Sequence, residues 1–498
     1  MKTKYIIFIF LVLSISSCKK FLNDEQQGVY SSATFYKNQG QAIMAINSAY
    51  NDLLFNSSDN CIWVFGDVAS DDAVKGSLSG DQLDIQYIDQ FSVVSSNIML
   101  LSIWMRDYDC ITRANIVLNQ VPNISMDANL KAQILGEAKY LRAHMYFYLV
   151  NIFGSIPIKL NPPVTQADVN VAKSPVADVY RQIELDLIAA AAVLPATYAV
   201  SDAGRATKGA ALGLLAKAYM FEGKYPETLL TINSIDSLQI YSLMSLYSAN
   251  FHAATQSNQE SLFEVHHKRG QNPGLGNYLN QDFSPRGDGI YSGYAFDAPT
   301  QNFVSEFEMT ADSVVDPRLD YTVGRPGQKW INGENFIQTW SVTTYVSKKH
   351  IQPFSEVPNA TADGYLSYVY LRYADILLMK AEALNETGKT AEALIPLNLV
   401  RKRARESYLY DTNLVGFGSI PLNLLPDISS TLQSDVRTAI RHERRVELGM
   451  EFHRFFDLMR YGKPAAEAAL TGTGFSYDAD RYFPIPLNEQ DNNPNLNN

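Results

Sequence analysis

Apolar and small residues recur at helical spacing along most of the chain. The clearest case is the stretch 371–405, where they continue up to Gly388 and resume in a second run beyond it. Residues three and four positions apart lie on one face of a helix, so the pattern predicts two packed helices. Gly388 suits the turn between them, because glycine adopts a positive φ at little cost.

The stretch 207–232 has the same arrangement. Ala218 precedes Gly223 by the same interval that separates Ala383 from Gly388, and a lysine follows each glycine. Repeated helix pairs are typical of tetratricopeptide-like scaffolds, in which each pair buries its apolar face against the next. Residues 137–154 match the pattern in part. Further helices are predicted at 35–54, 104–118, 130–153, 176–194 and 436–461, the last as one long helix or a broken pair.

Two parts of the chain lose the helical period. Residues 61–90 are rich in Gly, Asp and Ser, and residues 251–363 combine Gly, Asn and Asp with many aromatic side chains. Linkers lack such aromatic content, and long loops in a helical protein are often functional. We expect loops, short helices and a few short strands there, laid over the scaffold. The terminal segment 482–496 is expected to be extended, with Pro484 and Pro486 fixing its backbone.

The predicted fold class is therefore mainly α, with tetratricopeptide-like helical hairpins as the scaffold and a long irregular insertion. We predict a single domain over residues 35–498. It divides into an N-terminal part at 35–250, the loop-rich insertion at 251–363, and a C-terminal helical part at 364–498.

The first residues have the pattern of an export signal. Two lysines precede an apolar run at 5–13, which is too short to span a bilayer, and Ser16 and Ser17 lead directly to Cys18. This resembles a bacterial lipobox, with Ile15 where leucine is preferred. It predicts a signal peptide at 1–17, acylation of Cys18 and a polar tether at 18–34. An ordinary signal peptide that happens to be followed by cysteine remains the alternative.

The net charge bears on the partner, and the cysteine content bears on cross-linking. The chain of 498 residues has a net charge of −11 and no basic block, which argues against a nucleic-acid partner. Cys61 and Cys110 would form a disulfide in an exported protein, or would both be buried free thiols.

The residues that carry catalytic chemistry do not form a recognisable motif. His442 lacks a second histidine at position 446, and the adjacent His266 and His267 would point apart, so no metal site is predicted. No nucleophile elbow, phosphate loop or dinucleotide fingerprint occurs, so no cofactor and no catalytic residue are predicted. One dense group of charges at 441–454 is compatible with a carboxylate or phosphate site. Alternating signs at helical spacing favour ion pairs that fix the last helices to the core. Its members are Arg441, Glu443, Arg444, Arg445, Glu447, Glu451 and Arg454.

Aromatic residues in the irregular parts are the best candidates for a binding site. Exposed Tyr and Trp rings stack on sugar faces, while Asp, Asn and Arg bond to hydroxyl groups. The alternative is that each ring holds its loop to the scaffold; Trp104, in a helical pattern, is predicted to be core. An adjacent carboxylate pair could bind ligand or cation, but adjacent carboxylates rarely converge on one glycosidic bond. The predicted ligand-binding residues are Trp63, Asp71, Asp72, Tyr278, Tyr291, Tyr294 and Trp330, and Phe296 and Trp340 belong to the same aromatic set.

Five segments, in this order, resemble the SusD/RagB family of surface lipoproteins of the Bacteroidetes. They are the lipobox at Cys18, AKYLRAHMYFYLVNIFGSIP at 138–157, LRYADILLMKAEALNETG at 371–388, IRHERRVELGMEFHRFFDLMRYG at 440–462 and YFPIPLNEQDNNPNL at 482–496. The last three are the most specific. The insertion at 251–363 matches poorly.

The resemblance implies a non-catalytic binding protein on the outer face of the outer membrane. It implies a partner, a TonB-dependent transporter of the SusC type, to which captured oligosaccharide or, in some members, peptide is passed. The family has no fixed ligand motif that could be carried over to this chain. Two other interpretations stay open: a helical glycoside hydrolase with two carboxylates across a cleft, and a structural adaptor whose loop aromatics are all buried.

Overall fold

The computed structural model describes residues 35–287 and 291–497. The predicted signal peptide, the acylation site Cys18 and the tether at 18–34 lie outside the described residues. Helices dominate the described chain, which confirms the mainly α fold class. The irregular segments carry short helices and five of the six described short strands, as predicted for the insertion, and the sixth strand lies just beyond it at Tyr368–Arg372.

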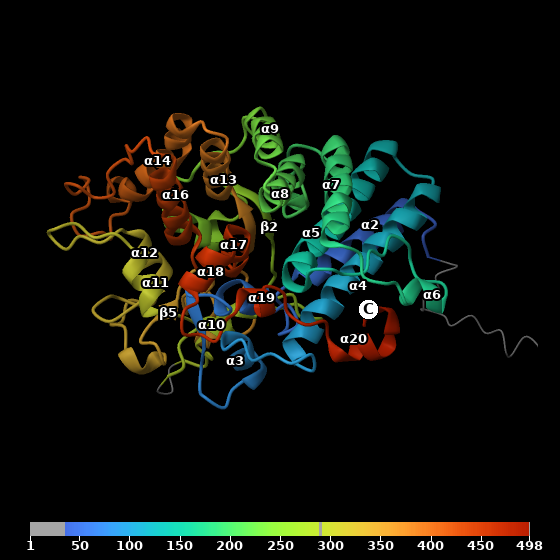
Figure 1. The fold of residues 1–498 in the computed structure, drawn as a ribbon, viewed down its shortest axis with the longest axis horizontal. Coiled ribbons are helices and arrows are strands. Elements are labelled where there is room, and N and C mark those ends of the chain that lie inside the picture. Colours follow the sequence, from blue (N-terminus) through green and yellow to red (C-terminus); the bar gives the residue numbers. More distant parts are fainter. Residues whose placement is uncertain (1–34, 288–290, 498) are drawn as a thin grey trace, which may run out of the picture.

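The longer helices pack one after another through the molecule (Figure 1). Helix α5 packs between α4 and α7, α7 packs against α8, and α8 against α9. Helix α9 contacts α13, which in turn packs against α14 and α16. The bounds are α2 (Gln39–Tyr50), α4 (Ile98–Gln120), α5 (Ala128–Phe153), α7 (Val176–Val193), α8 (Lys208–Phe221), α9 (Tyr225–Asp236), α13 (Tyr373–Glu386), α14 (Thr390–Arg405) and α16 (Gln433–Leu448).

Both predicted hairpins form at the expected places. Helices α8 and α9 turn at Gly223, and α13 and α14 turn at Gly388, with φ of 70° and 79°. Helix pairs that cannot bury their apolar faces alone are stabilised by stacking, and the contact between α9 and α13 joins these two. Whether they belong to the tetratricopeptide class stays a prediction.

The C-terminal part contains a broken helix pair, α16 and α17 (Arg454–Tyr461), in place of one long helix. Short helices α18 (Lys463–Ala469), α19 (Tyr477–Asp480) and α20 (Leu487–Asn492) follow. The expectation of a wholly extended C-terminal segment is wrong at α20. Pro486 occupies the N-cap position of that helix, where a missing N–H breaks no helical hydrogen bond, so the proline starts the helix instead of preventing it.

Three two-stranded antiparallel sheets tie distant segments together. Strand β1 (Ala73–Gly76) pairs with β3 (Phe296–Pro299), β2 (Ser261–Val265) with β6 (Tyr368–Arg372), and β4 (Val323–Gly324) with β5 (Val346–Ser347). Besides several 3-10 turns, the other short elements are the π-helical turn η2 (Val64–Val68), α3 (Leu83–Asp89), α6 (Gln166–Val169), α10 (Leu279–Phe283), α11 (Gln301–Glu306), α12 (Arg318–Thr322) and α15 (Ser407–Tyr410). Figure 1 shows the short helices α10, α11 and α12 below α14 and α16, away from α7 and α8.

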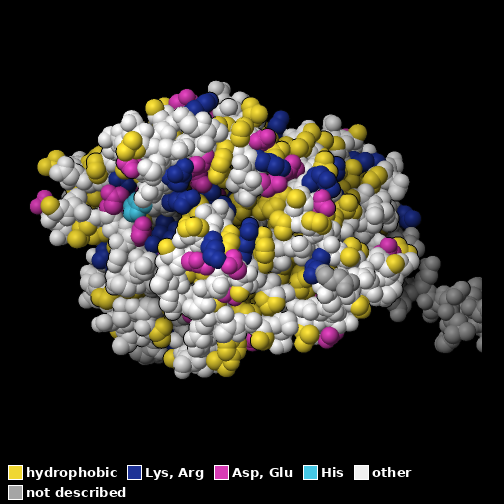
Figure 2. Space-filling model, viewed as in Figure 1, with side chains coloured by type: hydrophobic (Ala, Val, Ile, Leu, Met, Phe, Trp, Pro, Cys, Tyr) yellow, Lys and Arg dark blue, Asp and Glu magenta, His cyan; other side chains and the backbone are white. Residues whose placement is uncertain are grey.

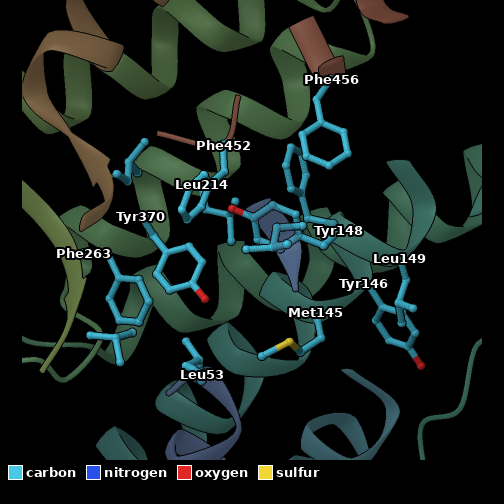
Figure 3. Close-up of a cluster of buried hydrophobic side chains, with 14 of the residues drawn as sticks. Leu53, Met145, Tyr146, Tyr148, Leu149, Leu214, Phe263, Tyr370, Phe452 and Phe456 are labelled. Carbon is cyan, nitrogen blue, oxygen red and sulfur yellow. The ribbon is translucent and has the colours of Figure 1, made fainter. Parts of the chain in front are cut away.

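The main core lies between the helical stack and the β2–β6 sheet. Tyr148 of α5, Phe263 of β2, Tyr370 of β6 and Phe456 of α17 converge there (Figure 3). The β-carbon of an alanine at Gly213 would come within 2.4 Å of Leu371 Cδ2, so glycine permits the close approach of α8 to β6. Aromatic side chains fill this core because they bury large apolar areas.

Two sequence interpretations concern buried residues. Cys61 and Cys110 are both free and buried, which decides between the two alternatives for the cysteines. Burial raises the pKa of the Cys61 thiol to about 12, so the thiol stays protonated and unreactive. Trp104 is buried in the core, as its helical pattern predicted.

Candidate functional site

A cavity of about 370 Å³ lies where the segment 58–63 and helices α3 and α4 meet the insertion. Helix α10 and strand β3 form the insertion side of it. Seven of its twelve lining residues are apolar or aromatic and five are polar or charged, a combination found in many small-molecule sites. The residues are Ser58, Cys61, Trp63, Asp81, Gln82, Ile85, Met99, Tyr278, Asp282, Arg286, Tyr294 and Phe296.

The pairing of β1 with β3 brings the two halves of this cavity together. Gly76 is paired with Phe296, one of the lining residues. Gly76 has a φ of 73°, and an added β-carbon would lie 2.2 Å from the carbonyl oxygen of Ala295. Only glycine allows both this conformation and this approach. The backbone N–H of Tyr278 also donates to the carbonyl of Phe55, at 2.6 Å, and so fixes the start of α10.

The aromatic wall consists of buried rings behind and partly exposed rings in front. The indole of Trp63 is 5% exposed and packs edge-on against Phe283 at 5.3 Å, and 5.9 Å from Phe296. Tyr294 packs on Phe296 with ring centroids 6.0 Å apart, and both Tyr294 and Tyr278 keep part of their surface in solvent. The two tyrosine rings are therefore available to a ligand, held from behind by a rigid apolar layer.

The polar side of the cavity contains one ion pair and one buried carboxyl group. Arg286 pairs with Asp81 and donates to Ser77 Oγ at 3.1 Å. Ser77 Oγ in turn donates to Asp81 at 2.7 Å. Asp282 is 8% exposed, and burial raises the pKa of its carboxyl group to about 7. Burial, Asp282 and Tyr294 together raise the pKa of Tyr278. Asp282 lies one helical turn after Tyr278, and the backbone N–H of Tyr294 donates to the carbonyl of Gln281 at 3.0 Å, so the three residues are neighbours.

Three of the predicted binding residues, Trp63, Tyr278 and Tyr294, come together in this cavity. The sequence analysis missed Asp81, Asp282 and Arg286. Their only signal was their position in the two irregular segments, with Asp282 one helical turn after Tyr278.

The structure places Asp71 and Asp72 elsewhere, in ion pairs with the C-terminal helices. Asp71 accepts from Arg454 at 2.8 Å and contacts Arg445 at 2.9 Å, while Asp72 accepts from Arg445 at 2.7 Å. Both side chains are at most 8% exposed. These carboxylates connect the start of β1 to α16 and α17. Because the two arginines already pair with them, they are not part of the candidate binding site.

Trp330 and Tyr291 belong to a second, buried aromatic cluster inside the insertion. Trp330 is 2% exposed and lies 5.9 Å from Trp340. An added β-carbon at Gly324 would come within 2.4 Å of its ring. Tyr291 packs on Trp340 at 4.9 Å, and its hydroxyl is bonded to Glu334 and Asn332. These rings hold the loops together, which was the alternative considered for each of them.

Most of the dense charge group at 441–454 forms buried ion pairs, which is the interpretation that the sequence favoured, whereas Arg441 lies over the ring of Tyr461, 4.1 Å from its centroid. Arg318 bonds Glu443 at 2.5 Å and Glu447 at 3.0 Å, and Arg372 bonds Glu447 at 2.6 Å and Glu451 at 2.8 Å. Burial alone would raise the pKa of Glu451, but Arg372 and Lys349 outweigh it and lower the pKa to about 2, so this carboxylate is ionised and paired. On the face in Figure 2, Lys and Arg side chains lie among Asp and Glu side chains.

His442 also has carboxylate partners. Its ring nitrogens lie 2.8 Å from Glu306 and 3.2 Å from Glu308. Burial alone would lower the pKa of His442, but these hydrogen bonds outweigh it and raise the pKa to about 9. Among residues 35–287 and 291–497, no group of three or more His, Cys, Asp and Glu side chains is arranged to hold a metal ion.

Comparison with known proteins agrees with this architecture. Residues 259–498 match the family model described as the SusD family, and residues 22–220 match one described as "Starch-binding associating with outer membrane". The chain belongs to the SusD/RagB family. This confirms the resemblance found in the sequence.

Several SusD-like relatives cover almost the whole chain. SusD-like protein P2 of Formosa agariphila is 26% identical over 100% of this chain and 99% of its own length. A laminarin-binding SusD-like protein of known structure is 28% identical, with a TM-score of 0.75, over 92% of this chain and 98% of its own. A SusD-like carbohydrate-binding protein from Bacteroides fragilis shares the fold with a TM-score of 0.80 at 24% identity, over 93% of this chain and 100% of its own.

The family description places SusD-like proteins in association with the outer membrane. Within the described part of the chain, no helix combines the length and hydropathy needed to cross a bilayer.

Proposed function

We propose that this SusD family member is a lipid-anchored glycan-binding protein on the outer surface of the outer membrane. It captures oligosaccharide in the cavity formed by Trp63, Tyr278 and Tyr294 and delivers it to a SusC-type TonB-dependent transporter. The observation that carries the proposal is this cavity, which combines two partly exposed tyrosine rings with hydrogen-bonding groups. The laminarin-binding relative and the starch-binding description of the family support glycan as the ligand.

The anchor and the partner rest on the sequence pattern and the family resemblance. Acylation of Cys18 would tether the fold through residues 18–34, and two or more acyl chains hold a protein stably at a membrane.

The binding role is tested with soluble protein lacking residues 1–18. Titration calorimetry against a panel of neutral and acidic oligosaccharides, including laminarin fragments, identifies ligands. Loss of a tyrosine ring that covers one sugar face costs about 1–2 kcal/mol, or about five- to thirtyfold in Kd. We expect Tyr278→Ala and Tyr294→Ala each to weaken binding by this amount. Tyr410→Ala removes an exposed tyrosine of α15 and serves as the matched control.

Unchanged affinity in both cavity variants would show that glycan binds elsewhere. Saturable binding to none of the panel would refute the proposed function itself.

One observation favours a second candidate, glycoside hydrolysis. Asp81 and Asp282 line the same cavity, and their pKa values are shifted in opposite directions. The hydrogen bond from Ser77 lowers the pKa of Asp81, and burial raises the pKa of Asp282. Such a difference is typical of an acid and a base in one active site. Asp81 is, however, already bonded to Arg286 and Ser77. Release of shorter sugars by the wild type and its loss in Asp282→Asn would favour the hydrolase, whereas binding without product favours capture.

A further inference from the structure

Few charged side chains line the candidate cavity. Asp81, Asp282 and Arg286 are the only Asp, Glu, Lys or Arg side chains among its described lining residues. Arg286 is paired with Asp81 and also donates to Ser77, so the single cation is already neutralised. An anionic ligand is bound most strongly where the charge of an arginine or lysine is not already balanced by a neighbouring carboxylate.

Asp282 is the lining group that remains available. Its side chain is more than nine-tenths buried, and burial alone shifts its pKa, since no described residue forms a hydrogen bond or ion pair with its carboxyl oxygens. It belongs to α10, the helix that begins next to Tyr278, and Tyr278 and Tyr294 are its near neighbours. Burial without an ion-pair partner raises its pKa to about 7, so near neutrality it both donates and accepts hydrogen bonds.

We infer that this cavity selects uncharged sugar residues and excludes those carrying a carboxylate or sulfate, and that Asp282 sets this selection by bonding a sugar hydroxyl between the two tyrosine rings. The inference rests on the proposed glycan-binding function. A hydroxyl group satisfies Asp282 in either protonation state, as donor or as acceptor.

An anionic substituent on the sugar would bind unfavourably in this cavity. It would lose hydration inside the cavity without gaining a cation, because Arg286 is held by Asp81. It would also face the negative charge of ionised Asp282, and repulsion between like charges is strong where water is excluded. The faces of the tyrosine rings attract CH groups of the sugar, and their negative quadrupole disfavours an anion placed against them.

The experiment compares matched ligands on the soluble protein lacking residues 1–18. The panel contains neutral oligosaccharides of glucan, mannan, xylan and galactan, and acidic ones from alginate, polygalacturonate and sulfated galactan. The tightest binder among the neutral hexose oligosaccharides is then oxidised at C6 to give a carboxylated derivative of the same linkage and length. We expect the neutral form to bind and the carboxylated form to bind at least tenfold more weakly.

Variants assign the selection to Asp282. Asp282→Asn retains the shape and a hydrogen-bonding group but removes the charge. The ratio of Kd values between carboxylated and neutral forms should fall at least threefold in this variant. Asp312→Asn, which removes an exposed carboxylate elsewhere in the insertion, should leave that ratio at the wild-type value.

The possible failures are distinguishable. If the wild type binds the carboxylated or other acidic glycans as tightly as neutral ones, and Tyr294→Ala weakens that binding, glycan capture stands and the selection is refuted. An unchanged ratio in Asp282→Asn refutes the role of Asp282. If no glycan in the panel binds, the proposed function and the selection built on it both fall. The wild-type comparison needs no variant and stands even where Asp282→Asn does not fold.

Discussion

Replacing Gly76 by alanine is expected to disturb the cavity and destabilise the protein together. Gly76 has a φ of 73°, and an alanine there would first pay about 1–2 kcal/mol for its left-handed backbone. Its β-carbon would also lie 2.2 Å from the Ala295 carbonyl oxygen and 3.0 Å from the side chain of Ala298. Strand β1 must then move away from β3.

The movement has a calculable cost. Relieving such overpacking costs about 1–3 kcal/mol. The hydrogen bond from Ser77 N–H to the Ala295 carbonyl, 2.9 Å long, would be lost at a further cost of about 1 kcal/mol. The expected total loss of unfolding free energy is therefore about 3–6 kcal/mol. Because Phe296 is paired with Gly76, the aromatic wall would shift and glycan affinity would fall as well.

Gly388→Ala provides the matched control. Gly388 has a φ of 79°, but no atom lies within 4 Å of an added β-carbon. It should lose only about 1–2 kcal/mol, the backbone cost, and retain glycan affinity. Urea unfolding of both variants, with calorimetric titration of glycan, measures the difference. Equal losses of stability in the two variants, or unaltered glycan affinity in Gly76→Ala, would refute the role assigned to the β1–β3 contact.

Three further predictions follow from the charges and the anchor. Arg445→Met should lower the unfolding free energy by about 3–5 kcal/mol, because it leaves the buried carboxylates of Asp71 and Asp72 short of a partner; a loss below 1 kcal/mol would contradict this. Protonated His442 should stabilise the fold, because its pKa is raised from 6.5 to about 9 in the folded state. This contribution to the unfolding free energy should be complete below pH 6.5 and should be lost as the pH rises through about 9. Urea midpoints from pH 6 to 9.5 test it against His442→Gln, and parallel pH profiles for the two proteins would count against it. Cys18→Ala should abolish incorporation of labelled palmitate and release the protein from the outer-membrane fraction, whereas retention there would exclude Cys18 as the anchor.

The helical scaffold was predictable because its signals are local. Periodic apolar residues and the glycines at 223 and 388 determine each hairpin within a few dozen residues, and both turns form at those glycines. The wrong prediction of an extended chain at α20 also has a local cause. Pro486 fits either an extended chain or the start of a helix, and the sequence does not distinguish the two.

The candidate site was predictable only in part, because exposure depends on contacts between distant segments. Trp63, Tyr278 and Trp330 are all aromatic residues of the irregular segments, and the sequence does not separate them. Trp63 and Tyr278 line the cavity, whereas Trp330 is buried against Trp340. Asp71 has its partner Arg454 383 residues away, a pairing that local patterns do not reveal. Asp282 was missed for the same reason, since its burial is a property of the assembled cavity.

The ion pair between Arg286 and Asp81 joins residues 205 positions apart, and the β1–β3 sheet closes the same large loop. Contacts of such separation form late, because the entropy of closing the loop must be lost before they contribute stability. The hairpins α8–α9 and α13–α14 need no such closure. The helical frame therefore folds as a set of neighbours, while the cavity exists only once the chain has reached beyond β3. Fragments that end before that strand would lack Phe296 and the β1–β3 pairing, and therefore the cavity itself.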